Sequence, residues 1–225
     1  MNIKYSKQKQ ELREDPVLDG LLSTKEFVQK NLNTLVGVVL ALVLVSGIFL
    51  VFNYIQKSRI KSAREEFGKA MVFYSEQKLT EAVDQFRTVA ENSRRSVAGT
   101  MSAYMLGSIL YQQGRYDEAI TWYEAVNKGA NVGFINAQAY EGLAACYEVK
   151  ADTTAAIKNL ELALDDERAS YRRNALRWKM ALLSRSTDMA RSKKICDEII
   201  ADTTAQEYWH DAEFLKATLI NKTAG

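Results

Sequence analysis

Residues 100–126 read TMSAYMLGSILYQQGRYDEAITWYEAV. Helix-forming residues recur here at helical spacing, and no alternation of apolar and polar residues suggests a strand. The rest of the chain has the same character, and its single proline is Pro16. Because proline is the strongest helix breaker, its absence beyond Pro16 allows uninterrupted helices. The sequence therefore predicts an all-α fold.

A pattern of small and large residues within this stretch returns elsewhere at a fixed interval. The best copy, starting at residue 100, contains Leu106, Gly107, Gly114, Tyr116, Ala119 and Tyr123. A second copy starts at Ala137 and contains Tyr140, Leu143, Ala144, Tyr147, Ala156 and Ala163. A weaker copy starts at Ala63 and contains Ala70, Phe73, Ala82 and Phe86. The starts at 63, 100 and 137 are 37 residues apart, which indicates stacked repeats of one structural unit.

The pattern resembles the tetratricopeptide repeat, a two-helix unit of about 34 residues. The three extra residues fit in linkers such as residues 128–134. A degenerate fourth copy starts near Tyr171, and residues 205–221 are expected to form the cap helix that helical solenoids need. The resemblance implies that Gly107, Ala119, Ala144 and Ala156 lie where paired helices approach most closely, with larger residues filling the space between hairpins.

The same resemblance places partner binding on the concave face, which the first helix of each hairpin lines. The implied groove residues are Phe67, Met71 and Tyr74 in the first repeat, Tyr104, Ser108, Tyr111 and Gln112 in the second, and Glu141 and Glu148 in the third. Secondary candidates are Arg64, Met101, Gln138, Ala145, Val149, Arg172 and Lys179. Aromatic and Met side chains are common anchors in binding surfaces. The alternative is that several of these residues pack beneath the neighbouring long helix. The Lys/Asn clamp of chaperone-tail binders is missing, because Tyr104, Ser108 and Gln112 occupy its positions.

A second feature divides the chain. Residues 35–55, LVGVVLALVLVSGIFLVFNYI, contain no charged residue. About 20 such residues cross the roughly 30 Å hydrocarbon core of a bilayer, whereas a buried helix of a soluble protein usually keeps a polar side. The run starts too late, and is followed by too many charges, for a cleavable secretion signal. No strong helix breaker follows it before residue 77, so the helix is expected to continue.

These observations predict four segments. Residues 1–22 form a charged tail, residues 23–34 an interfacial helix, residues 35–55 a transmembrane helix, and residues 56–225 the repeat domain. Ser23 and Glu26 fit a capping box at the start of the interfacial helix.

The sequence points away from several classes of function. Beyond residue 55 there are 24 basic and 23 acidic residues, which does not favour a nucleic-acid partner. We find no catalytic constellation around the single histidine, His210, no phosphate loop and no metal motif, so no enzyme activity, cofactor, metal or small-molecule substrate is expected. Cys146 and Cys196 are expected to be small buried residues rather than a disulfide pair.

Charge is sorted along the repeats. Residues 141–167 carry seven acidic and two basic residues, whereas residues 168–194 carry nine basic residues and one acidic residue, Asp188. Neighbouring repeats can offset each other, or the basic segment can meet an acidic partner or anionic lipid.

The layout as a whole resembles the bacterial ancillary SecYEG translocon subunit family. The residues that carry this resemblance are the interfacial segment TKEFVQKN, one apolar span, the following SAREEFGKA segment and a repeat domain of about 160 residues. It implies a single-pass inner-membrane protein with periplasmic repeats, whose partners are the translocon and membrane-anchored chaperones. The flanking charges alone favour cytoplasmic repeats, because Lys57, Arg59, Lys61, Arg64 and Lys69 follow the span whereas Lys25 and Lys30 precede it. The alternative function is a structural accessory subunit of another membrane complex, with the repeats as framework.

Overall fold

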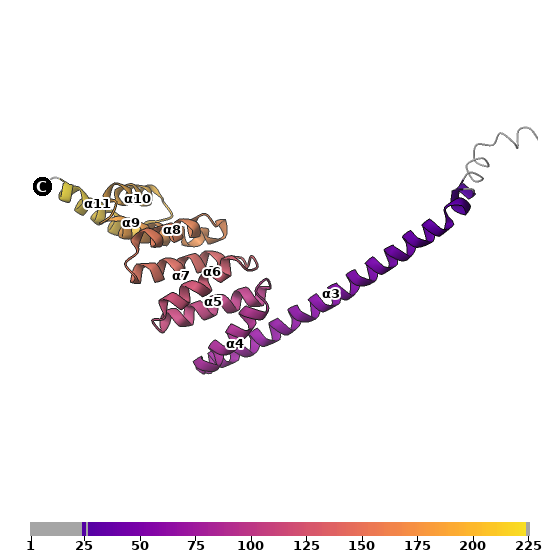
Figure 1. Cartoon of the computed structure of the whole chain (residues 1–225). Coiled ribbons are helices and arrows are strands. Elements are labelled where there is room, and N and C mark those ends of the chain that lie inside the picture. The colour runs from indigo at the N-terminus through magenta and orange to yellow at the C-terminus, as the bar shows by residue number, and fades with distance from the viewer. Residues whose placement is uncertain (1–23, 26, 224–225) are drawn as a thin grey trace, which may run out of the picture. The chain divides into compact units, whose positions relative to one another are not determined.

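The computed structural model describes residues 24–25 and 27–223 (Figure 1). The predicted tail, residues 1–22, and the predicted capping box of Ser23 and Glu26 lie outside these residues. The chain divides into two compact units, Met1–Ser58 and Arg59–Gly225. Helices are the regular elements throughout the described part, which contains no strand, and the predicted all-α class is confirmed.

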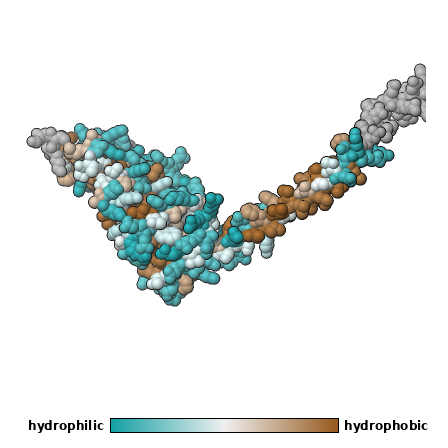
Figure 2. Space-filling model, viewed as in Figure 1, coloured by the Kyte–Doolittle hydropathy of each residue, from teal (hydrophilic) through white to brown (hydrophobic). Residues whose placement is uncertain are grey.

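The first unit contains a long apolar helix. Residues 27–30 are helical, a turn falls at Asn31, and α3 (Leu32–Ser75) begins directly afterwards. Helical hydrogen bonding crosses the turn, because the Asn31 amide donates to the Phe27 carbonyl (3.0 Å) and the Leu35 amide donates to the Asn31 carbonyl (2.9 Å). The apolar part of α3 is long enough to cross a membrane, and none of it is buried. Figure 2 shows this part covered by hydrophobic side chains.

The second unit is a series of antiparallel helix pairs. Besides the end of α3, its elements are α4 (Leu79–Asn92), α5 (Val97–Gln112), α6 (Tyr116–Asn127), α7 (Ile135–Val149), α8 (Thr153–Leu164), the 3₁₀ helix η1 (Glu167–Arg172), α9 (Arg173–Ser184), α10 (Met189–Ala201), the 3₁₀ helix η2 (Gln206–Tyr208) and α11 (Trp209–Thr223). Each helix from α4 onward packs against the next one along the chain. This is the tetratricopeptide helical-repeat fold. The expected cap helix begins later than residue 205, because η2 precedes α11.

The turns inside the first three hairpins repeat the 37-residue period. Gln77, Gly114 and Ala151 occupy the same place in successive repeats, and all three have a positive φ, of 60°, 76° and 59°. Only glycine adopts this left-handed conformation without steric cost. In the fourth repeat the turn is one residue longer, residues 185–188 against 150–152, and Thr187, the residue before the N-cap Asp188, does not have a positive φ. Asp188 caps α10 by accepting a hydrogen bond from the Arg191 amide (2.9 Å), as Asp152 caps α8 in the third repeat. The fourth repeat therefore departs from the pattern in its turn.

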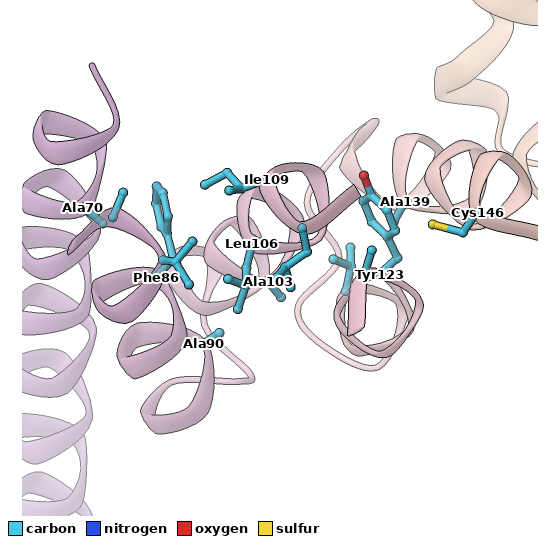
Figure 3. Packing of buried hydrophobic residues seen from close by; sticks show 14 of the residues in the cluster. Ala70, Phe86, Ala90, Ala103, Leu106, Ile109, Tyr123, Ala139 and Cys146 are labelled. Carbon is cyan, nitrogen blue, oxygen red and sulfur yellow. The ribbon is translucent and has the colours of Figure 1, made fainter. Parts of the chain in front are cut away.

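Two clusters of buried side chains form the core of this unit. The first joins α3 to α7 and includes Ala70, Phe86, Leu106, Tyr123 and Cys146 (Figure 3). The second joins α7 to α11 and includes Ala144, Leu160, Met180, Ile199 and Leu219. The small residues expected at close helix contacts, Gly107, Ala119, Ala144 and Ala156, are all buried. Cys146 and Cys196 are free and buried, which confirms the prediction for both.

Candidate protein-binding cleft

A cleft of about 370 Å³ opens between the first helices of three successive hairpins, α5, α7 and α9. These helices are the ones that line the concave face in a tetratricopeptide solenoid. The residues that line the cleft are Tyr104, Tyr111, Tyr123, Gln138, Glu141, Gly142, Ala145, Leu160, Arg172, Ala175, Leu176 and Lys179. Its wall therefore combines aromatic, aliphatic and charged side chains.

The floor of the cleft includes the ring of Tyr123, which α6 supplies. This ring lies between two glycines: a Cβ atom added to Gly107 of α5 would lie 2.9 Å from Tyr123 Cδ1, and one added to Gly142 of α7 would lie 2.5 Å from Tyr123 Cζ. The Tyr123 hydroxyl donates a hydrogen bond to Ser108 Oγ (3.2 Å). Burial raises the pKa of Tyr123 to about 12, so the floor is uncharged at neutral pH.

Two further tyrosines of α5 stand on the cleft wall. The ring of Tyr104 is half-buried and lies 6.0 Å from that of Tyr123, measured between centroids. The ring of Tyr111 meets Tyr116 of α6 edge-on at 5.5 Å. Burial also raises the pKa of Tyr104, against the opposing effect of Ser108. Both rings are thus held by aromatic neighbours while one face stays open to the cleft. Aromatic side chains fixed in this way can anchor a partner at a small cost in conformational entropy.

Ion pairs join α7 to the opposite wall. Arg172, at the end of η1, donates a hydrogen bond from Nε to Glu141 Oε1 (2.8 Å), and its Nη2 lies 2.8 Å from Glu141 Oε2 in an ion pair. A second pair joins α9 to α7, because Lys179 Nζ lies 2.9 Å from Glu148 Oε2. Arg172 and Lys179 each keep more than a third of their side-chain surface exposed. Such partly exposed pairs contribute little stability, so an incoming segment can displace them at small cost.

These pairs also explain the charge step in the sequence. Arg172, Lys179 and Arg191 belong to the basic segment, and their partners Glu141, Glu148 and Glu161 belong to the acidic one. Neighbouring repeats therefore offset each other, as the first interpretation of the charge pattern holds.

The predicted groove residues are only partly brought together. Tyr104, Tyr111 and Glu141 line the cleft, as do the secondary candidates Gln138, Ala145, Arg172 and Lys179. Ser108 holds the floor through Tyr123, and Glu148 reaches the cleft through its pair with Lys179. Ser108 and Glu148 do not line the cleft themselves. The other four predicted residues and the three remaining secondary candidates do not line it either: Phe67, Met71, Tyr74 and Gln112, and Arg64, Met101 and Val149.

The first-repeat residues have other surroundings. The ring of Phe67 packs against buried Phe86, with centroids 5.8 Å apart, and Tyr74 packs on the first core cluster. Met71 is exposed on α3. Phe67 and Tyr74 belong to the long helix α3 itself and pack against the first core cluster, so neither faces the cleft.

Sequence reasoning missed part of the floor. Five residues line the cleft that are not among the groove residues predicted from the sequence: Tyr123, Gly142, Leu160, Ala175 and Leu176. Gly142 could have indicated this part of the floor, because it is a second small residue close to Ala144 in the third repeat.

The cleft carries no arrangement of groups suited to metal binding. Within residues 24–25 and 27–223 there is no group of three or more His, Cys, Asp or Glu side chains that could hold a metal ion. His210 lies on α11 with a fully exposed side chain, 4.0 Å from Glu213.

Comparison with known proteins supports the fold. Residues 67–131 match the tetratricopeptide repeat family, and the curated proteins contain no match to this chain. Among solved structures, Pseudomonas aeruginosa PilF is 16% identical, with 70% of this chain and 72% of that chain covered and a TM-score of 0.50. A MamA RS-1 ArsTM double mutant is 16% identical, with 69% and 76% covered and a TM-score of 0.48. A putative kinesin light chain of Podosopora anserina with nearly identical TPR-like repeats is 15% identical, with 72% and 94% covered and a TM-score of 0.48. Tetratricopeptide repeats generally mediate protein–protein interaction, so the chain has the architecture of a protein-binding scaffold.

Proposed function

We propose that this chain is a membrane-anchored scaffold whose cleft between α5, α7 and α9 holds a segment of a partner protein. The observation that carries the proposal is the open cleft itself, in which Tyr104 and Tyr111 stand on a fixed aromatic floor. Its volume of about 370 Å³ suits a few side chains of an inserted segment rather than a whole domain.

The anchoring part of the proposal rests on α3. Its apolar run has no charged residue between positions 35 and 55, and large side chains such as Leu44 and Ile48 are 67% and 70% exposed. A run of this length covered by water would be strongly unfavourable, whereas it matches the thickness of a bilayer.

The proposed setting is the bacterial inner membrane. The layout of one span followed by a tetratricopeptide domain resembles an accessory subunit of the Sec translocon, with the repeats in the periplasm. The partners would then be the translocon and membrane-anchored chaperones, and the cleft would hold one of their segments during protein trafficking. The competing function is a structural subunit of another membrane complex, in which the cleft stays bound to one neighbour in a fixed ratio.

Photo-crosslinking from single positions tests the proposal. A photoreactive amino acid at Gln138 of α7 faces the cleft, whereas one at Lys193 of α10 is exposed elsewhere. The proposal predicts crosslinks to protein from position 138 in intact membranes and few from position 193. Equal yields from both positions would contradict a dedicated cleft. Gentle extraction then separates the two functions, because a structural subunit purifies with one complex in a fixed ratio and an adaptor does not.

A further inference from the structure

A second, larger groove lies between α9, with the turn that follows it, and α11. It has a volume of about 600 Å³ and is lined by Trp178, Leu182, Arg185, Ser186, Asp211, Phe214, Leu215, Thr218 and Leu219. None of these residues lines the first cleft. Leu215 and Leu219 form an apolar floor that belongs to the second core cluster, and the ring of Trp178 is held by Tyr208, 6.3 Å away between centroids.

Phe214 makes this groove unusual. The sequence predicts that residues 205–221 form a cap helix, which in a solenoid turns a polar face to solvent. On α11, however, Phe214 lines the groove with 76% of its surface exposed. Covering an exposed aromatic ring removes apolar surface from water, which favours association. The groove therefore has an apolar centre that a packed partner would bury.

The rim of the groove carries two opposite charges. Arg185 follows the last residue of α9, and Asp211 lies in the first turn of α11. Neighbouring charged residues such as Arg177 and Lys216 form ion pairs. Over residues 24–25 and 27–223, neither Arg185 nor Asp211 has an ion-pair partner.

We infer that this groove is a homodimer interface, in which a second copy of the chain covers Phe214 and pairs its own rim charges with Asp211 and Arg185. Around a two-fold axis, each contact between two positions occurs twice with the copies exchanged. Arg185 of each copy then pairs with Asp211 of the other copy. The two ion pairs formed in this way flank the two buried Phe214 rings. A single apolar partner of another kind would leave both charges without a defined role.

The dissociation constant of the dimer is measured by sedimentation equilibrium on the full chain in detergent. The native chain is expected to form a dimer. Phe214→Glu is expected to raise the dimer dissociation constant at least tenfold while leaving the helical circular dichroism unchanged, because the side chain is already exposed. Phe134→Glu is the matched control, since Phe134 is 48% exposed and lies outside the groove. It should leave the dissociation constant unchanged.

The rim charges allow a sharper experiment. Arg185→Glu places like charges opposite each other twice in its own dimer, and so does Asp211→Arg, so each variant alone should associate at least tenfold more weakly. When the two variants are mixed, both contacts join opposite charges, and a mixed dimer should form with nearly native affinity. Differently tagged copies then purify together only in the mixture.

Three results would overturn the inference. The first is a native chain that stays monomeric at concentrations of tens of micromolar. The second is a dimer that persists in Phe214→Glu, which would place the interface elsewhere, for example in α3. The third is failure of the two rim variants to associate when mixed, with photo-crosslinks from position 214 leading to a different protein. That last result would assign the groove to another partner.

Discussion

The ring of Tyr123 lies against Gly142 so closely that a Cβ atom at position 142 would come within 2.5 Å of Tyr123 Cζ. Gly107 meets the same ring from the other side. Three helices, α5, α6 and α7, are therefore joined at one tyrosine, and this tyrosine is also the floor of the cleft. The stability of the repeat domain and the shape of the site depend on the same contact.

Enlarging the small residues at these contacts should destabilise the fold. Gly107→Leu forces α5 away from Tyr123, and Ala156→Leu overfills a position that is 0% exposed. Overpacking of this kind costs about 1–3 kcal/mol, which lowers the melting temperature of residues 59–225 by several degrees at about 2–4 °C per kcal/mol. Gly68→Leu is the matched control, because nothing lies within 4 Å of a Cβ added there, and its melting temperature should not fall. An unchanged melting temperature for the first two variants would mean that the repeat register is wrong.

Gly114 and Ala151 occupy equivalent left-handed turns, and substitutions there should change the free energy of unfolding in opposite directions. Gly114→Ala places a Cβ atom on a residue with φ of 76°, and Ala151→Gly removes one at φ of 59°. The left-handed conformation costs a non-glycine residue about 1–2 kcal/mol, partly offset by the greater freedom of glycine in the unfolded chain. Urea unfolding should show Gly114→Ala less stable by about 1 kcal/mol and Ala151→Gly more stable by a smaller amount. If both substitutions changed the free energy of unfolding in the same direction and by the same amount, backbone strain at these positions would not be the cause.

The buried thiol of Cys146 predicts how stability changes in alkali. Burial raises its pKa from 9.0 to about 11, so the folded state holds the proton more tightly than the unfolded state does. The resulting stabilisation is complete below pH 9 and is lost as the pH rises from about 9 to about 11. Native protein and Cys146→Ala should be compared by urea unfolding at pH 8 and at pH 10.5. The native protein should lose more stability than the variant between these two values, and parallel losses would contradict the assignment.

The proposed topology is tested with protease. If the repeats lie in the periplasm, protease added to spheroplasts should digest the chain beyond about Gln56 without lysis. A cytoplasmic protein serves as the control for intact spheroplasts. Full protection until lysis would falsify the periplasmic orientation and would agree with the flanking charges, which favour cytoplasmic repeats.

Much of the fold follows from local patterns that sequence displays directly. The 37-residue spacing and the small residues at 107, 119, 144 and 156 each reflect helix contacts that a single repeat specifies on its own. The helix was also expected to continue past the uncharged run of residues 35–55, and α3 does so to Ser75.

The candidate site was less predictable because it depends on contacts between repeats. Whether Phe67 faces a groove or the core is decided by Phe86 of α4, which covers it. Gly142 matters only because Tyr123 of the preceding hairpin reaches it. Such facts arise from the stacking of repeats, which the pattern within one repeat does not specify.

Partner binding in the cleft between α5, α7 and α9 can be measured as the yield of crosslinks from position 138, compared between the native protein and the double variant Tyr104→Ala/Tyr111→Ala. Binding energy at interfaces concentrates in a few anchors, and these two rings are the half-buried aromatic groups on the cleft wall. The double variant should keep its helical circular dichroism. Its crosslinking yield should fall more than tenfold, which corresponds to a loss of about 1.4 kcal/mol or more of binding free energy. A folded double variant that crosslinks at the native yield would contradict partner binding in this cleft.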